Sequence, residues 1–274
     1  SCGDCYYCSR DHHSLCETIF PLDTASPLQD QYGHALGHGL RTGAFAEQVV
    51  VHESQVLGIP TSVPMTSAAL LSCGVVTGFG AVANVARVVP GSSVVTIGTG
   101  GIGLNCIQGA AICGSQVNIA VDLVDEKIQA ALQLGATHGI NPANDDINDK
   151  IGQLTEGRGA DYVFVAAGSA AAVEQALTLV RRAGMVVLVG MTAEGVTAQF
   201  ETLNLANDAI QLVGSKMGQT HLDTDIPRLV DHYLEGSLKL DELVSECYPL
   251  EGINDAITAV KEGQALRNVI VFDS

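Results

Sequence analysis

The chain has 274 residues, of which 47% are hydrophobic and 16% charged, and it carries 30 glycines and a net charge of −17. This length allows one large or two ordinary domains, and the composition favours an α/β protein with a buried parallel sheet. An acidic surface repels phosphate backbones, so we expect no nucleic-acid partner. We also expect no membrane association, because no apolar run approaches the ~20 residues of a membrane span.

Four of the eight cysteines crowd the start of the sequence, Cys2, Cys5, Cys8 and Cys16, with the spacing C-x2-C-x2-C-x7-C. Closely spaced cysteines in an intracellular enzyme typically bind metal rather than form disulfides, and four thiolates around one zinc make a closed structural site. An iron–sulfur cluster competes, but its bacterial pattern has a shorter last spacer and a proline after the last cysteine. We therefore predict a structural zinc lobe.

The first residues after this lobe predict little regular structure. Residues 18–43 are typical of a loop, and we interpret His34 and His38 as loop histidines, because the segment lacks the glutamate of a zinc-binding H-E-x-x-H helix. Residues 44–52 predict a strand. Residues 65–89 hold a helical stretch containing Cys73, which by pattern alone is a buried core thiol.

The strongest motif runs from Val94 to Asp122 and has the order strand, glycine turn, helix, strand, acid. Its turn reads G-x-G-G-x-G, with Gly98, Gly100, Gly101, Ile102 and Gly103 as candidate cofactor-binding residues. Such glycines allow a tight turn, backbone approach to a pyrophosphate and close helix packing, and the helix N-terminus faces the phosphate. Asp122 accepts hydrogen bonds from a ribose 2′-hydroxyl and repels a 2′-phosphate, so the motif predicts NAD over NADP.

Strands and helices alternate after Asp122, which predicts a doubly wound parallel sheet. We expect helices over residues 125–134 and from Ser169, as its cap, to Arg182, and strands at 138–140, 161–166, 185–190 and 210–214. Val165, Val189 and Met191 lie near strand ends, where the cofactor crosses such a sheet, and would line its nicotinamide side. Helices at 225–235 and from 252, and a strand at 269–272, close the chain.

The chain resembles the zinc-dependent, medium-chain alcohol dehydrogenases. The resemblance rests on the cysteine lobe, Gly43-Ala44-Phe45-Ala46-Glu47, Cys73-Gly74 with Thr77-Gly78, the glycine turn, and the closing segment Leu266-Arg267-Asn268-Val269-Ile270-Val271-Phe272. In that family about 90 residues precede the lobe. Because the sequence also lacks an initiator Met, we expect it to be N-terminally truncated.

The resemblance implies three parts: residues 1–74, a partial GroES-like, β-rich catalytic domain with the zinc lobe; residues 75–216, the NAD-binding Rossmann domain; and residues 217–274, a return to the catalytic domain. It makes Cys73 a ligand of the catalytic zinc and places Thr77 beside the nicotinamide. It assigns Lys127 to the adenine ribose. Without the resemblance, Lys127 could equally be a solvent-exposed lysine on a helix. It brings Arg267 to the pyrophosphate.

The implied activity is reversible, NAD-linked oxidation of an alcohol to an aldehyde or ketone, in the cytoplasm, by a homodimer or homotetramer. The other catalytic-zinc ligands belong to the missing front, so we expect a catalytic zinc only in the full-length protein and an inactive fragment here. The alternatives are a nucleotide- and zinc-binding module without turnover, a polyol or S-(hydroxymethyl)glutathione dehydrogenase, and the zinc-free quinone reductase branch, which the cysteines argue against.

Overall fold

The computed structural model describes residues 1–37 and 39–272, and its chain divides into two compact units. The smaller unit comprises Ser1–Ser62 and Val244–Ser274, and the larger comprises Val63–Leu243. The expected boundaries after residues 74 and 216 do not coincide with these divisions, since the helical segment that carries Cys73 and the helix that follows residue 220 both belong to the larger unit.

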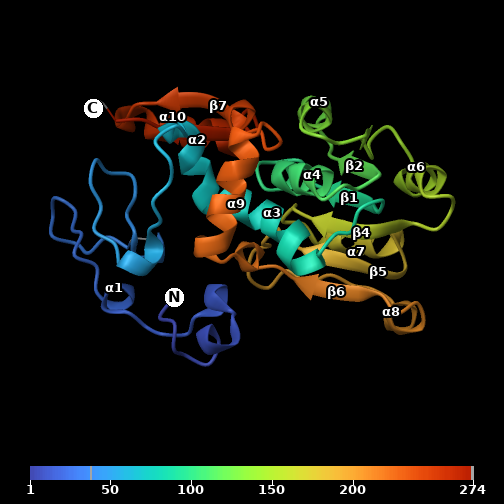
Figure 1. The fold of residues 1–274 in the computed structure, drawn as a ribbon, viewed down its shortest axis with the longest axis horizontal. Helices are drawn as coiled ribbons and strands as arrows, with labels where there is room; N and C mark the ends of the chain where they lie inside the picture. Colours follow the sequence, from blue (N-terminus) through green and yellow to red (C-terminus); the bar gives the residue numbers. More distant parts are fainter. Residues whose placement is uncertain (38, 273–274) are drawn as a thin grey trace. The chain divides into compact units, whose positions relative to one another are not determined.

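A six-stranded parallel sheet forms the centre of the larger unit, in the order β3-β2-β1-β4-β5-β6 (Figure 1). Its strands are β1 Ser93–Ile97, β2 Val117–Val121, β3 His138–Ile140, β4 Ala160–Val165, β5 Val180–Leu188 and β6 Gln211–Gly214. The order reverses direction beside β1, and this is the arrangement of a dinucleotide-binding Rossmann sheet. The doubly wound fold predicted from the alternation of strands and helices is confirmed.

Helices cover both faces of this sheet, because successive strand residues point to opposite sides. The crossover helices are α4 Gly103–Ile112, α5 Asp125–Gln133, α6 Ile147–Leu154, α7 Ala170–Leu179 and α8 Thr202–Asn207, and α9 Leu222–Leu234 follows the sheet. On β1, Val95 and Ile97 pack in a core with α6 and α7, whereas Val94 packs in a second core with α4. The carboxyl ends of the strands therefore stand on a rigid, two-sided scaffold.

One apolar helical segment precedes the sheet. It consists of α2 Met65–Leu70, the π-helix η5 Leu71–Val75, α3 Val76–Gly80 and the π-helix η6 Ala81–Ala86. It has 22 residues, and an 18-residue window within it has a mean hydropathy of 1.7, so it is long and apolar enough to span a membrane and the expectation that no segment has that length was wrong. However, 61% of that window is buried within the protein, and a Cβ on Gly78 would clash with the Ile102 carbonyl oxygen of the glycine turn. Such burial is typical of a core helix.

The smaller unit contains short helices and one two-stranded sheet. Its N-terminal part has η1 Cys8–Arg10, η2 His13–Leu15, α1 Pro21–Thr24, η3 Gly39–Arg41 and η4 Glu53–Gln55; its C-terminal part has β7 Val244–Tyr248, η9 Leu250–Gly252, α10 Ile253–Lys261 and β8 Arg267–Ile270. The strand predicted at residues 44–52 is wrong. A strand needs a hydrogen-bonded neighbour, and among the described residues before 63 the structure contains only the isolated bridge between Gln29 and Ala35.

Several predicted element ends shift. The α7 helix stops at Leu179, before the predicted Arg182, because β5 already begins at Val180; Ser169 is its N-cap residue but its side chain makes no capping hydrogen bond. The last strand of the chain is Arg267–Ile270 rather than 269–272. His34 lies in a turn, where Nδ1 is 2.9 Å from Asp30 Oδ2, and His38 lies outside the described residues.

Candidate functional site

The glycine turn joins β1 to α4. At two of its positions, Gly98 and Gly103, the turn has no room for a side chain. Gly98 has φ +90°, which is unfavourable for other residues. A Cβ on Gly103 would lie 1.8 Å from the Gly98 carbonyl oxygen, so the first turn of α4 rests directly on the backbone. Gly100 differs, because a Cβ there would meet no described atom within 4 Å. The turn is thus closed on the protein side and open at Gly100.

The N-terminus of α4 faces this open side. Ile102 occupies the N-cap position and has no side-chain oxygen to accept a backbone N–H, and the first turn of the helix carries no acidic residue. The Leu104 and Asn105 N–H groups in the first turn already donate to the Gly100 and Ile102 carbonyl oxygens, so an anion would rely on the helix dipole and the N–H groups of the preceding glycine turn. Gly101 contributes through its carbonyl oxygen, which accepts a 2.7 Å hydrogen bond from the buried Asn105 amide and so holds the turn on the helix.

Asp122 lies directly after β2 and is tied to the glycine turn. Its Oδ2 accepts hydrogen bonds from the backbone N–H (2.7 Å) and the hydroxyl (2.9 Å) of Thr99, and its Oδ1 accepts one from the Val124 N–H at 3.1 Å. Parallel pairing in register brings the ends of β1 and β2 side by side, with Ile97 opposite Val121. The carboxylate is therefore fixed beside the turn, and it keeps acceptor capacity for a further hydroxyl.

The other predicted cofactor residues occupy different environments. Val165 and Val189 are buried, and their side chains pack in the two separate cores, on opposite sides of the sheet. Met191, two residues beyond Val189, is 90% exposed. Lys127 is half-buried in the first turn of α5, five residues after Asp122. Arg267 is half-buried at the first position of β8 in the smaller unit.

Thr77 and Cys73 lie on the apolar helical segment. Thr77 is 6% exposed, and its hydroxyl contacts the sulfur of Met217 at 3.7 Å. Cys73 is exposed on η5, which differs from the buried core thiol that the pattern alone indicates. In the described part of the chain, Cys73 does not belong to a group of three or more close metal-ligating side chains. The π-helical backbone around Cys73 is a conformation found frequently at functional sites, and Thr77 follows it on the α-helix α3.

The four N-terminal thiols come together. The sulfur atoms of Cys2, Cys5, Cys8 and Cys16 all lie within 4.8 Å of one another, and those of Cys2 and Cys8 are 3.9 Å apart. A disulfide requires about 2.05 Å, so these thiols are unbridged. Four sulfurs at about 2.3 Å from one tetrahedral zinc lie about 3.8 Å from one another. The separations therefore suit a single metal ion better than disulfides, and better than an iron–sulfur cluster, whose thiolates attach to separate irons.

The backbone around the lobe also suits thiolates. The Cys2 sulfur accepts the Cys5 N–H at 3.3 Å, the Cys5 sulfur accepts the Cys8 N–H at 3.5 Å, and the Cys16 sulfur accepts the Cys2 N–H at 3.4 Å. The backbone hydrogen bond from Cys8 lowers the pKa of Cys5 to about 6, whereas burial raises the pKa of Cys8 to about 11. A cation among the four sulfurs would offset that burial and the repulsion between thiolates. The donor set therefore fits zinc.

One polar cluster escaped the sequence reasoning. Asn84 on η6, the turn η7 Met217–Gln219, and Asp225 and Arg228 on α9 form a hydrogen-bonded network beside Thr77. More than 130 residues separate Asn84 from its partners in the sequence, so spacing could not reveal the cluster. The sole local signal is Asp225, an acid at a buried position of an otherwise amphipathic helix.

Comparisons with known proteins agree with this geometry. Residues 101–235 match the family model described as zinc-binding dehydrogenase. The chain is 34% identical to alcohol dehydrogenase-like 7 of Arabidopsis thaliana over 98% of its own length and 72% of that protein. A zinc-binding-domain alcohol dehydrogenase protein from Burkholderia ambifaria superposes with a TM-score of 0.94 at 32% identity, over 100% of this chain and 76% of that one.

The benzyl alcohol dehydrogenase of Acinetobacter calcoaceticus superposes with a TM-score of 0.91 at 30% identity, over 99% of this chain and 75% of that one. The matches extend over the cysteine lobe, the helical segment with Cys73 and the whole Rossmann unit. With its glycine turn, its acid after β2 and its cluster of four thiols, the chain belongs to the zinc-dependent, medium-chain alcohol dehydrogenase family.

Proposed function

We propose that this protein is an NAD-linked, zinc-dependent alcohol dehydrogenase that interconverts a primary or secondary alcohol and its aldehyde or ketone. The observation that carries the choice of NAD is Asp122. Its carboxylate is held at the glycine turn by Thr99 and Val124, where it would accept the ribose 2′-hydroxyl and repel the 2′-phosphate of NADP. The open position at Gly100 and the glycine turn before α4 would receive the pyrophosphate, with the helix dipole behind them.

Other residues have supporting roles in this proposal. Lys127 would contact the adenine ribose, and Arg267 would contact the pyrophosphate. Thr77 would lie on the nicotinamide side, as would the exposed Met191, which follows the end of β5. The buried Val165 and Val189 would act through backbone position, since Val189 and Gly190 both donate their N–H to the Val165 carbonyl, at 3.0 and 2.8 Å.

Zinc enters the proposal twice. The four thiols of Cys2, Cys5, Cys8 and Cys16 would hold a structural ion that ties the first 16 residues together. Cys73 would be one ligand of a catalytic zinc, which as a Lewis acid lowers the pKa of a bound alcohol. We propose a homodimeric or homotetrameric cytoplasmic enzyme, and polyols and S-(hydroxymethyl)glutathione remain alternative substrates.

A second candidate is a protein that binds NAD and zinc without turnover. It is favoured by the position of Cys73, which in the described residues has no cluster of further ligands around it, and a catalytic zinc needs three protein ligands. The observation concerns the catalytic zinc alone, so both candidates share the cofactor site and the cysteine lobe.

Titration of the purified chain with NADH and NADPH, followed by NADH formation from ethanol or benzyl alcohol, tests both candidates. Tight NADH binding, weaker NADPH binding and NAD-dependent turnover support the dehydrogenase. The same binding without turnover is expected of this chain under both candidates, because Cys73 by itself cannot hold a catalytic zinc, so only observed turnover separates them. A preference for NADPH, or no affinity for either nucleotide, would overturn the assignment of NAD.

A further inference from the structure

The turn η7, Met217–Gln219, has an unusual backbone. Three successive residues adopt positive φ values, 52° at Met217, 61° at Gly218 and 49° at Gln219. Two of them carry side chains, for which the left-handed region is unfavourable. Such a conformation persists only where its surroundings enforce it, and it occurs preferentially at functional sites. The contacts that hold this turn therefore indicate what the turn does.

The first set of contacts joins the turn to α3. A Cβ on Gly218 would lie 2.3 Å from the Val76 carbonyl oxygen and 2.7 Å from the Gly80 Cα, so the two backbones touch. The Thr220 hydroxyl is within hydrogen-bond distance of the carbonyl oxygens of Met217 (2.7 Å) and Val76 (3.3 Å). These contacts place the Met217 sulfur 3.7 Å from the Thr77 hydroxyl.

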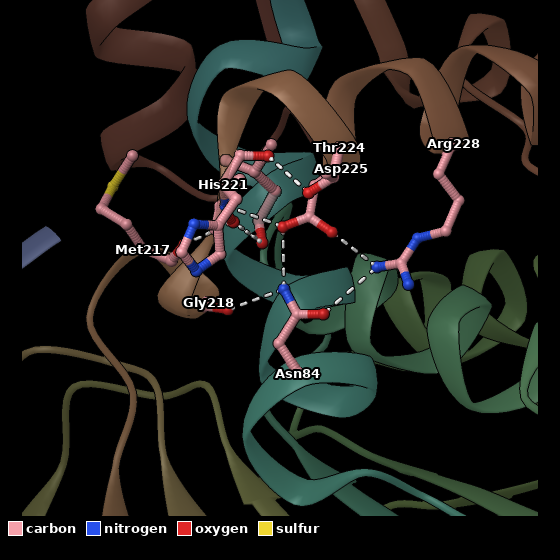
Figure 2. Close-up of polar contacts among 9 residues, drawn as sticks. Asn84, Met217, Gly218, His221, Thr224, Asp225 and Arg228 are labelled. Atoms are coloured by element: carbon pink, nitrogen blue, oxygen red, sulfur yellow. Dashed lines mark hydrogen bonds and ion pairs between the residues drawn. The ribbon is translucent and has the colours of Figure 1, made fainter. Parts of the chain in front are cut away.

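The second set of contacts centres on the Asp225 carboxylate (Figure 2). Its Oδ2 accepts hydrogen bonds from the Asn84 amide at 3.0 Å and the His221 backbone N–H at 2.9 Å, and its Oδ1 accepts one from Arg228 Nη2 at 2.9 Å. The Asn84 amide also donates to the Gly218 carbonyl oxygen at 3.2 Å, and its own oxygen accepts from Arg228 at 3.2 Å. The network thus contacts the turn at Gly218 and the chain just after the turn at His221.

Burial of the Asp225 carboxylate carries a desolvation cost. At 7% exposure, Asp225 is the only charged side chain among the buried residues that the structure describes. Its ion-pair partner Arg228 is only half-buried, and such a pair contributes little net stability, because screening and the desolvation of Asp225 offset the attraction. Arg228 is additionally held by the Phe79 ring, whose centroid lies 5.0 Å from its Cζ. A network of this cost is better explained by the conformation that it specifies than by stability.

We propose that Asp225, Asn84 and Arg228 form a positioning network that holds the left-handed turn Met217–Gln219 against Thr77 and thereby shapes the nicotinamide end of the cofactor site. The three side chains are positioning residues, acting through the turn and Thr77. The inference rests on the proposed function, because it takes Thr77 to be a neighbour of the nicotinamide. It predicts that losing the network weakens recognition of the nicotinamide while the adenosine half of the cofactor binds as before.

NADH and ADP-ribose separate these effects, because ADP-ribose has the adenosine and pyrophosphate but no nicotinamide. In Asp225→Ala and Asn84→Ala, the Kd for NADH should rise about tenfold, whereas the Kd for ADP-ribose should stay within about twofold. The double variant should lose little more than the larger single loss, because both side chains act through one connected network. Asp161→Asn is the matched control: its carboxylate accepts from Ser93 and Arg181 at the amino ends of the strands, and neither Kd should change.

Equal weakening of NADH and ADP-ribose would overturn the inference, because it would indicate general loosening of the unit. Unchanged NADH affinity in both single variants would overturn it as well. If Asp225→Ala does not fold, Asn84→Ala carries the test, since the Asp225 carboxylate there keeps the His221 N–H and the Arg228 guanidinium as partners. Wild-type protein that binds neither NADH nor ADP-ribose would refute the proposed function, whereas wild-type protein that binds ADP-ribose as tightly as NADH would refute this inference alone.

Discussion

Substitution of Gly100 by alanine should separate cofactor binding from folding. A Cβ at this position meets no described atom within 4 Å, and the backbone does not adopt the left-handed conformation that strains side chains. The folded protein therefore accommodates the methyl group. Since alanine also restricts the unfolded chain, the free energy of unfolding should stay equal or rise by up to about 1 kcal/mol.

The same methyl group should damage the binding of NAD. If the pyrophosphate approaches the open side of Gly100, a Cβ there moves it away from the N–H groups at the start of α4. Losing one or two hydrogen bonds to a charged group costs about 2–4 kcal/mol, which corresponds to a roughly 30- to 700-fold rise in Kd. Fluorescence titration with NADH measures this change, and urea denaturation measures the stability of the same preparation.

Gly103→Ala is the matched control, because the two glycines are three residues apart and have opposite surroundings. Its Cβ would lie 1.8 Å from the Gly98 carbonyl oxygen and 3.3 Å from the Ala166 Cβ. The start of α4 would have to move by more than 1 Å, at a cost of about 3 kcal/mol. Unimpaired NADH binding by Gly100→Ala, or loss of binding together with an equal loss of stability in both variants, would refute the assignment of the pyrophosphate to this turn.

Three further predictions concern other parts of the protein. Asp122→Ala should lower the preference for NADH over NADPH about 100-fold, since it removes an acceptor for the ribose and a charge that repels the 2′-phosphate; an unchanged ratio of the two Kd values would contradict NAD specificity. Cys16→Ser should reduce the zinc content, measured by atomic absorption, well below one ion per chain, and full retention would rule out the four-thiol site. Burial raises the pKa of Asp161, but hydrogen bonds from Ser93 and the Arg181 guanidinium outweigh burial and hold it below its ordinary value. Its stabilisation is therefore present above the unfolded pKa of about 3.9 and is lost as the pH falls through the lowered folded value; Asp161→Asn should flatten the acid limb of a stability–pH profile, and an unaltered limb would show that the carboxylate contributes nothing.

Local patterns predicted the Rossmann unit well. Each of its signals occupies only a few consecutive residues: the apolar runs of β1, β2, β4 and β5, the glycine turn, and the acid after β2. Parallel pairing of β1 with β2 then brings Asp122 to the turn. The cysteine lobe was equally predictable, because its four thiols lie within the first 16 residues. Prediction was poorer where an element depends on distant partners. Residues 44–52 have strand-like apolar residues but no neighbouring strand in the described residues, and the end of α7 is fixed by the start of β5.

The sequence by itself determined the class of fold, the family, the glycine turn and the close grouping of the four N-terminal cysteines, because these depend on contacts between near neighbours in the chain or on motifs of fixed spacing. Only the tertiary structure decided that Gly100 is open while Gly103 is closed, that Thr77 lies against Met217, and that Asp225 is buried within reach of Asn84 and Arg228. Those facts depend on how α3, α9 and the turn between β6 and α9 pack against one another. The packing of elements 140 residues apart is determined by the shape and burial of whole surfaces, and no short stretch of sequence records it.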